Sequence, residues 1–158
     1  EHLLGEENGG FQQIMANFAW ERLLMSIGAI GAMDRLIEVS VNYAKERQAF
    51  GRPIGSFQAI RHKIAMMATR TEASRAFAYD TLRRFHEGEV VVREVSMSKL
   101  DSQRALVDIA DEAIQIHGGY GYMREYEVER ALRDARLGPI GGGTDEIMME
   151  IIGKTYGL

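Results

Sequence analysis

Proline is scarce in this sequence, and its scarcity sets the strongest limit on the fold. Only two prolines occur among the 158 residues, so long stretches run without the residue that breaks helices. Most of the 17 glycines gather in four short groups, at 9–10, 51–55, 118–121 and 141–143. Such groups mark turns between segments rather than weakening every segment. We therefore expect long helices joined by glycine-rich turns.

The spacing of apolar residues predicts where those helices lie. Phe11, Ile14, Met15 and Phe18 recur at three- and four-residue steps, which is the period of one helix face. The same reasoning predicts helices over 11–47, 56–88, 91–118 and 126–136, and a last helix capped by Thr144. No segment shows the alternation of a strand. Long helices joined by short turns predict an all-α fold, an antiparallel up-down four-helix bundle with a short extra helix.

Composition excludes several classes of function. The formal net charge is −4 without a run of five like charges, which argues against a nucleic-acid or anionic-membrane partner. No apolar run is long enough to span a bilayer. The absence of cysteine excludes disulfides and thiolate chemistry. Because the chain opens on Glu1-His2-Leu3 without methionine, we expect it to be a piece of a longer protein.

Glu21 and Arg22 form the first candidate site. They lie beside Phe18, Trp20 and Leu23 on the first predicted helix. A carboxylate held among apolar side chains suits a general base. A Glu-Arg pair on a helix is more often a solvated surface pair, so both interpretations stay open at this point.

Three glycine-containing segments are the other candidates. Segment 47–58 fits an anion and cofactor site, since arginine offers a fork of donors for phosphate, or it is a plain helix corner. Segment 115–122 ends a helix, and its His117 fits packing or capping; no second histidine stands at metal spacing, so we predict no metal site. Loop 140–147 can cradle a phosphate on free N–H groups, or it is a simple helix cap.

In this order, the segments resemble the acyl-CoA dehydrogenase family from about residue 11 to residue 158. The motifs are Glu21-Arg22-Leu23, Arg47-Gln48-Ala49-Phe50-Gly51 with Phe57-Gln58, Gln115-Ile116-His117-Gly118-Gly119-Tyr120-Gly121-Tyr122, Leu132-Arg133-Asp134-Ala135-Arg136 and Gly142-Gly143-Thr144-Asp145-Glu146-Ile147. A complete subunit of that family has an N-terminal helical domain, a middle β-domain and a C-terminal four-helix domain. The chain resembles only the last. Residues 1–10 are then expected to be a remnant of the linker from the β-domain, and residues 11–158 the helical bundle domain.

The resemblance implies an FAD-dependent enzyme that acts on acyl-CoA thioesters. In this family a base removes the pro-R α-hydrogen as a proton, and the β-hydrogen passes as hydride to flavin N5, which yields the trans-2-enoyl-CoA. An electron-transferring flavoprotein usually reoxidises the flavin. The resemblance also implies a homo-oligomer, a dimer of dimers. It implies a cytoplasmic enzyme in bacteria or a mitochondrial-matrix enzyme in eukaryotes, and we favour the bacterial cytoplasm.

The resemblance carries over residue by residue. The implied flavin contacts are Arg47, Phe50 and Gln58, then Gln115, Ile116, His117, Gly118 and Gly119 across a subunit interface, and Thr144, Asp145 and Glu146 near the phosphates and ribose. The implied substrate contacts are Gly142 and Gly143 at the acyl pocket and Phe18 and Arg22 on the CoA side. Ala19 stands where many members have aspartate, which puts one CoA contact in doubt.

The catalytic base occupies one of two positions in this family. Many members carry a glutamate in the glycine loop, where this chain has Gly142. Members resembling the isovaleryl- and long-chain enzymes carry it just before Arg-Leu on the first long helix, where this chain has Glu21. The resemblance therefore implies that Glu21 is the base, and that Gly142→Glu would partly replace it.

Two other functions stay open from the sequence. The chain can be a non-catalytic helical oligomerisation module. It can also belong to a flavin monooxygenase or a nitroalkane oxidase on the same fold. Whether the enzyme is a dehydrogenase or an oxidase, we expect this segment alone to be inactive. Much of the surface that binds flavin and substrate is expected from other domains.

Overall fold

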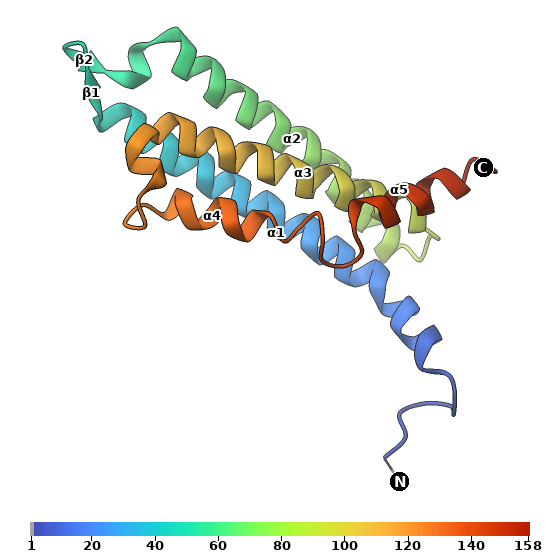
Figure 1. The fold of residues 1–158 in the computed structure, drawn as a ribbon. Helices are drawn as coiled ribbons and strands as arrows, with labels where there is room; N and C mark the ends of the chain where they lie inside the picture. Colours follow the sequence, from blue (N-terminus) through green and yellow to red (C-terminus); the bar gives the residue numbers. More distant parts are fainter. Residues whose placement is uncertain (1) are drawn as a thin grey trace.

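Five α-helices account for most of the chain, and the structure, a computed structural model, describes residues 2–158 (Figure 1). The helices are α1 (Gly10–Glu46), α2 (Gln58–His86), α3 (Val92–His117), α4 (Glu127–Ala135) and α5 (Asp145–Lys154). Short 3-10 turns, η1 (Ile54–Ser56) and η2 (Gly118–Tyr122), precede α2 and follow α3. The helix ends agree with the predicted ones to within two residues. The all-α fold class is confirmed.

Helix α3 is the centre of the bundle and packs against the other four helices. The three long helices α1, α2 and α3 run up, down and up beside one another (Figure 1). Two short helices take the place of a fourth long helix. Helix α4 packs against the C-terminal half of α3 and α5 against its N-terminal half, with residues 136–144 between them. This division places the glycine loop beside the middle of the bundle rather than at its end.

The core lies where the three long helices face one another. Large side chains in it that are at most 2% exposed are Ile30 and Met33 on α1, Met67 on α2 and Ile109 on α3. Burying such a side chain stabilises the fold by about 1.5–3 kcal/mol. Fully buried alanines line the same surfaces, at Ala78, Ala105, Ala110 and Ala113. Small side chains let helix axes approach closely, because the distance between helices depends on the residues at the contact.

A short β-hairpin joins α1 to α2, and the sequence did not predict it. Strand β1 (Gln48–Ala49) pairs antiparallel with β2 (Arg52–Pro53). Phe50 and Gly51 form the two-residue turn with φ of 52° and 77°, which is the backbone of a type I′ hairpin turn. Two-residue strands are too short to show alternation, so the pattern carried no signal for them.

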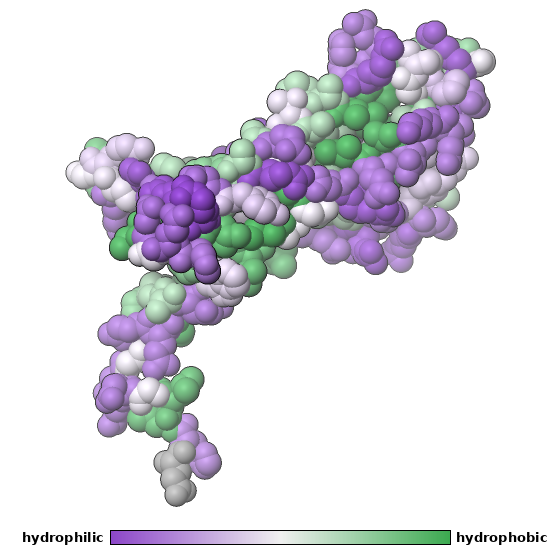
Figure 2. All heavy atoms as spheres, turned by 180° about the vertical axis from the view of Figure 1, so that it is seen from behind, coloured by the Kyte–Doolittle hydropathy of each residue, from purple (hydrophilic) through white to green (hydrophobic). Residues whose placement is uncertain are grey.

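The first turns of α1 project away from the bundle (Figure 1). Phe11 and Ile14 on this segment are 70% and 55% exposed, and Figure 2 shows apolar atoms along it. Burial of α1 begins only at Arg22 and Leu23. An exposed apolar stretch of this kind marks a surface for another domain or chain. Between residues 2 and 158, no helix combines the length and apolarity needed to cross a membrane.

Candidate active site

The glycine loop is tied to α1 by Arg22. The Nε atom of Arg22 donates a hydrogen bond to the carbonyl oxygen of Gly142 at 3.0 Å, although the two residues lie 120 positions apart. The guanidinium also lies over the Phe18 ring, 5.0 Å from its centroid. Arg22 is buried, and burial lowers its pKa from the usual value. The side chain predicted as a CoA contact therefore holds the loop in place, and its contact with substrate stays a prediction.

Lys99 on α3 holds the next residue of the loop. Its Nζ atom donates to the carbonyl oxygen of Gly143 at 2.7 Å, and its side chain is completely buried. Burial lowers the pKa of Lys99, while the nearby Asp145 carboxylate acts in the opposite direction. Lys99 was not among the residues predicted from the sequence. Its signal was present, since Lys99 follows buried Val95 by four positions and so lies on the apolar face of α3.

The two loop positions that these side chains hold favour glycine. Gly142 and Gly143 have φ of +65° and +100°, a region that side chains disfavour. A Cβ on Gly143 would lie 2.9 Å from the Met148 Cε, and a Cβ on Gly142 would lie 2.6 Å from the Met25 Sδ. The loop therefore passes close to α1 and to α5 at the same time.

Helix α5 begins directly after the loop, and its first residues are polar. The Thr144 hydroxyl accepts a hydrogen bond from the Ile147 N–H at 3.4 Å, so Thr144 is the N-cap as predicted. Asp145 is buried and accepts from the Arg104 Nε at 2.8 Å, but its Oδ1 has no partner along residues 2–158. Glu146 is exposed, and hydrogen bonds from its own backbone and from Thr144 lower its pKa.

Glu21 lies one helical turn before Met25 on the side of α1 that meets the loop, since residues four apart share a helix face. The Asn17 Nδ2 donates to the Glu21 Oε1 at 2.5 Å. The expected apolar enclosure is incomplete in this chain. Glu21 is exposed, and its neighbours Trp20 and Leu24 are 43% and 47% exposed. Any desolvation of this carboxylate must come from surfaces outside residues 2–158.

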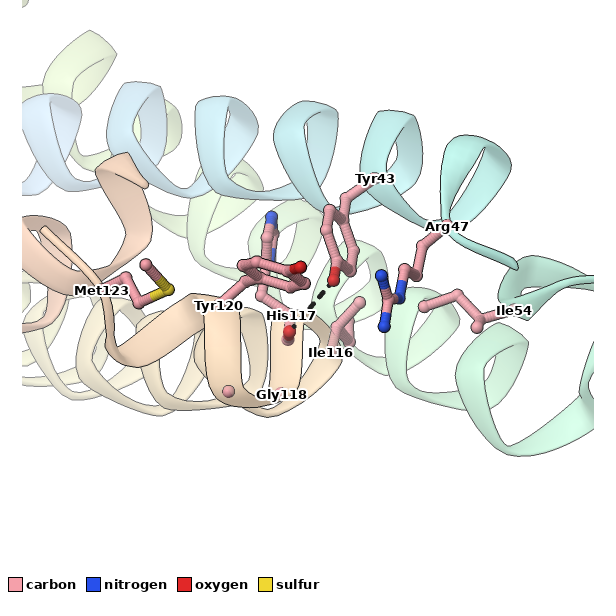
Figure 3. A pocket seen from close by; sticks show the side chains of 9 residues that line it. Tyr43, Arg47, Ile54, Ile116, His117, Gly118, Tyr120 and Met123 are labelled. Atoms are coloured by element: carbon pink, nitrogen blue, oxygen red, sulfur yellow. Dashed lines mark hydrogen bonds between the residues drawn. The ribbon is translucent and has the colours of Figure 1, made fainter. Parts of the chain in front are cut away.

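The second group of predicted residues lies at the corner between α1, η1 and η2. Arg47, Ile116, His117, Gly118 and Gly119 line one cavity of about 540 Å³ (Figure 3). The other lining residues are Tyr43, Ile54, Tyr120 and Met123. The structure thus brings together two segments that are about 70 positions apart in the sequence. The Arg47 guanidinium lies 5.1 Å from the Tyr120 ring centroid.

Three of the predicted cofactor residues of this second group lie outside the lining of the cavity. Phe50 is 95% exposed at the tip of the hairpin, and Gln58 is exposed at the start of α2. Gln115 is also exposed, so this polar residue needs no partner within an apolar core. All three face outward around the corner, and a ligand contact for them requires a molecule that extends beyond the cavity.

His117 is a packed residue, as the sequence predicted. Its Nδ1 lies 2.7 Å from the carbonyl oxygen of Ala113, and because a carbonyl only accepts, Nδ1 carries the proton. The Tyr43 ring stacks on the imidazole at 4.2 Å, and its hydroxyl donates to the His117 carbonyl at 3.2 Å. Burial lowers the pKa of His117 and raises that of Tyr43. Both groups are therefore neutral near pH 7.

The two groups form separate sites. We call Glu21, Arg22, Lys99 and residues 142–146 the loop site, and Arg47, Phe50, Gln58 and residues 115–119 the corner site. Lys99 and His117 mark the two sites on α3, and 18 helical residues separate them by about 27 Å. No group of three histidine, cysteine or acidic side chains is placed to hold a metal ion in the described part of the chain.

Comparison with known proteins identifies the family. Residues 8–157 match the family model described as acyl-CoA dehydrogenase, C-terminal domain. The chain belongs to the acyl-CoA dehydrogenase family. It is 44% identical over 153 residues to an acyl-CoA dehydrogenase of Bacillus subtilis, covering 97% of this chain and 40% of the relative. It is 42% identical to the mitochondrial isovaleryl-CoA dehydrogenase of Oryza sativa subsp. japonica, covering 98% of this chain and 38% of the relative.

Solved structures of this acyl-CoA dehydrogenase family have the same fold. The crystal structure of a probable acyl-CoA dehydrogenase from Mycobacterium abscessus superposes with a TM-score of 0.95 at 45% identity, covering 98% of this chain and 41% of that one. The chain thus spans about two fifths of the length of the proteins it matches.

Proposed function

We propose that this chain is the C-terminal domain of an FAD-dependent acyl-CoA dehydrogenase, and that the complete enzyme converts an acyl-CoA thioester to its trans-2-enoyl-CoA. The observation that carries the proposal is the pairing of Glu21 with a loop that has no side chain at position 142. One carboxylate is required at the α-carbon, and Gly142 supplies none. Glu21 stands one turn from Met25, which contacts the loop.

Glu21 removes the α-hydrogen as a proton, and the electron pair of that bond forms the new double bond as the β-hydrogen leaves as hydride. The flavin, when bound, supplies the acceptor for this hydride. The domain contributes the position of the base, because proton transfer needs the base within hydrogen-bond reach of its substrate. The long helix α1 holds Glu21, and Arg22 fixes the distance between that helix and the loop. The missing domains complete the desolvation of the carboxylate.

The polar groups at the start of α5 fit an FAD moiety that carries both phosphate and hydroxyl groups. A helix N-terminus offers unpaired N–H donors and the positive end of the helix dipole to an anion. Glu146 is ionised and only accepts hydrogen bonds, so it fits a ribose or ribityl hydroxyl rather than a phosphate. The unpartnered Oδ1 of Asp145 offers a further acceptor. Thr144 supplies a hydroxyl beside them.

The corner site fits the cofactor of another subunit. Arg47 offers a fork of donors suited to phosphate, and the exposed Phe50 ring offers a surface for stacking. Because about 27 Å of helix separates the two sites, each subunit would contribute its loop site to one flavin and its corner site to a second. This arrangement supports a homo-oligomeric enzyme, which the resemblance describes as a dimer of dimers. Reoxidation by an electron-transferring flavoprotein, and location in the bacterial cytoplasm or the mitochondrial matrix, are parts of the same proposal.

The direct test is Glu21→Gln in the full-length enzyme. Glutamine keeps the size and hydrogen bonding of glutamate but removes its basicity, so turnover should fall by at least ~10²-fold. Flavin content should stay at the wild-type level. Glu87→Gln is the matched control, an exposed acid just after α2 and outside both sites that should leave turnover unchanged. Normal turnover of Glu21→Gln with an acyl-CoA and an artificial electron acceptor would show that another group is the base.

A non-catalytic oligomerisation module is the second candidate. The exposed apolar residues at the start of α1 favour it, since they suit another chain as well as another domain. A full-length protein that purifies as a colourless oligomer, and takes up no flavin when FAD is added, would favour this candidate over the dehydrogenase.

A further inference from the structure

Met25 lies where the side chain of any non-glycine residue at position 142 would have to go. A Cβ built on Gly142 meets the Sδ of Met25 at 2.6 Å and its Cε at 3.6 Å. Real Cβ atoms do not approach a sulfur that closely, so the methionine side chain would have to move. The Gly142 φ of +65° adds a second cost, because residues with a Cβ seldom adopt it.

Neither backbone is free to retreat from this contact. The carbonyl oxygen of Met25 accepts a hydrogen bond from the Nε2 of Gln103, a largely buried side chain on α3, at 2.8 Å. The carbonyl oxygen of Gly142 accepts from the buried Arg22. Both sides of the contact are thus anchored by side chains from within the bundle. Only rotation of the Met25 side chain remains to relieve an added Cβ.

Met25 also lies on the route between the two positions that can carry the base. Glu21 precedes it by one turn, which is about 6 Å along the helix axis, and on the same face. By the resemblance, a carboxylate at position 142 or at position 21 serves the same α-carbon. The thioether of Met25 lies against the loop at Gly142.

We propose that Met25 is a specificity-determining residue that reserves position 142 for glycine, and thereby commits proton abstraction to Glu21. The proposal rests on the proposed function for the role of Glu21. Its prediction differs from the expectation drawn from the resemblance: Gly142→Glu alone should not replace Glu21 while Met25 is present. Removing the Met25 side chain opens the space that the new carboxylate needs.

The catalytic test compares three variants of the full-length holoenzyme in a Glu21→Gln background: with Gly142→Glu, with Met25→Ala, and with both. We expect turnover of the variant with both to exceed that of either other variant by at least ~10-fold, since a placed base contributes 10²–10⁴-fold when geometry is correct. Ile27→Ala in place of Met25→Ala is the matched control, because residue 27 lies on another side of α1. Equal turnover with and without Met25→Ala overturns the proposal.

A stability test judges the contact without reference to catalysis. Gly142→Ala, Met25→Ala and the double variant form a cycle of melting temperatures in otherwise wild-type holoenzyme. Gly88→Ala gives the cost of a positive φ alone, since Gly88 has φ +84° and no atom within 4 Å of an added Cβ. We expect Gly142→Ala to lower the melting temperature by more than Gly88→Ala, and the double variant to lose less than the two single losses added. Additive losses overturn the proposal even if the Gly142→Glu variants fail to bind flavin.

Full turnover of Glu21→Gln would instead overturn the proposed function, and the cycle of melting temperatures would still measure the contact of Met25 with residue 142.

Discussion

The Nζ of Lys99 donates a hydrogen bond to the carbonyl oxygen of Gly143 at 2.7 Å, from a side chain with no exposed surface. With Arg22 on Gly142, this contact means that two basic side chains from two helices hold consecutive carbonyl groups of one loop. The arrangement fixes the loop from inside the bundle.

Lys99→Met should destabilise the domain. The substitution keeps the length of the side chain but leaves the Gly143 carbonyl without a donor, which costs about 1–3 kcal/mol for a buried group. Denaturant unfolding of the flavin-bound enzyme measures the loss. Lys45→Met, on an exposed residue near the end of α1, is the control and should change stability by no more than about 0.5 kcal/mol. Equal stability of the two variants would mean that the Gly143 carbonyl finds another donor.

His117 should make stability depend on pH on the acidic side. Burial lowers its pKa in the folded state below the ordinary 6.5, so below pH 6.5 the unfolded chain binds a proton before the folded chain does. The contribution of His117 to stability is therefore present above pH 6.5 and is lost as pH falls toward the lowered pKa. Unfolding free energies between pH 7.5 and pH 5 measure this loss.

His117→Gln should weaken that pH dependence, because glutamine does not titrate. His62→Gln, on an exposed residue of α2, is its control and should keep the wild-type slope. A slope that is the same in wild type and in His117→Gln would contradict the assignment of the effect to His117.

Arg47→Gln should weaken flavin binding without disturbing the fold. Arg47 is exposed and its guanidinium lines the corner cavity, so its removal costs no core packing (Figure 3). Loss of a charge-assisted hydrogen bond to phosphate should raise the Kd of FAD by about 10-fold, equivalent to about 1.4 kcal/mol. Titration of apoenzyme with FAD measures the change, with the exposed Arg61→Gln as control. An unchanged Kd would remove Arg47 from the cofactor site.

The 158-residue chain expressed alone should be helical, inactive and self-associating. Phe11 and Ile14 present apolar surface that a neighbouring domain or subunit would cover. Circular dichroism, an acyl-CoA assay and sedimentation velocity check the three properties. Phe11→Ser with Ile14→Ser should reduce the association. Strictly monomeric sedimentation of the unmodified chain across micromolar concentrations would contradict this prediction.

Helices and caps followed closely from the sequence. The apolar period over 11–47 and the N-cap at Thr144 depend only on neighbours within one or two turns, and the structure confirms both. The hairpin at 48–53 escaped the same reasoning, because its strands contain two residues each. Its turn places Phe50 at positive φ, a backbone conformation that an apolar pattern does not predict.

The candidate site was predictable in its members but not in its arrangement. Sequence motifs named Glu21, Arg22 and the glycine loop, and they named Arg47 with residues 115–119. The motifs could not show that the loop site and the corner site are separate, because their separation is the length of α3 between them. They also suggested an enclosed Glu21, whereas this chain leaves it exposed.

The sequence by itself determined the helical class, the helix ends and the family, since local spacing and motif order carry that information. Only the tertiary structure decided that Lys99 is buried against Gly143 and that Met25 fills the space beside Gly142. These contacts join residues 44 and more than 100 positions apart. These contacts depend on how three helices pack around a loop. A local sequence pattern does not indicate which side chains meet across such a separation in the sequence.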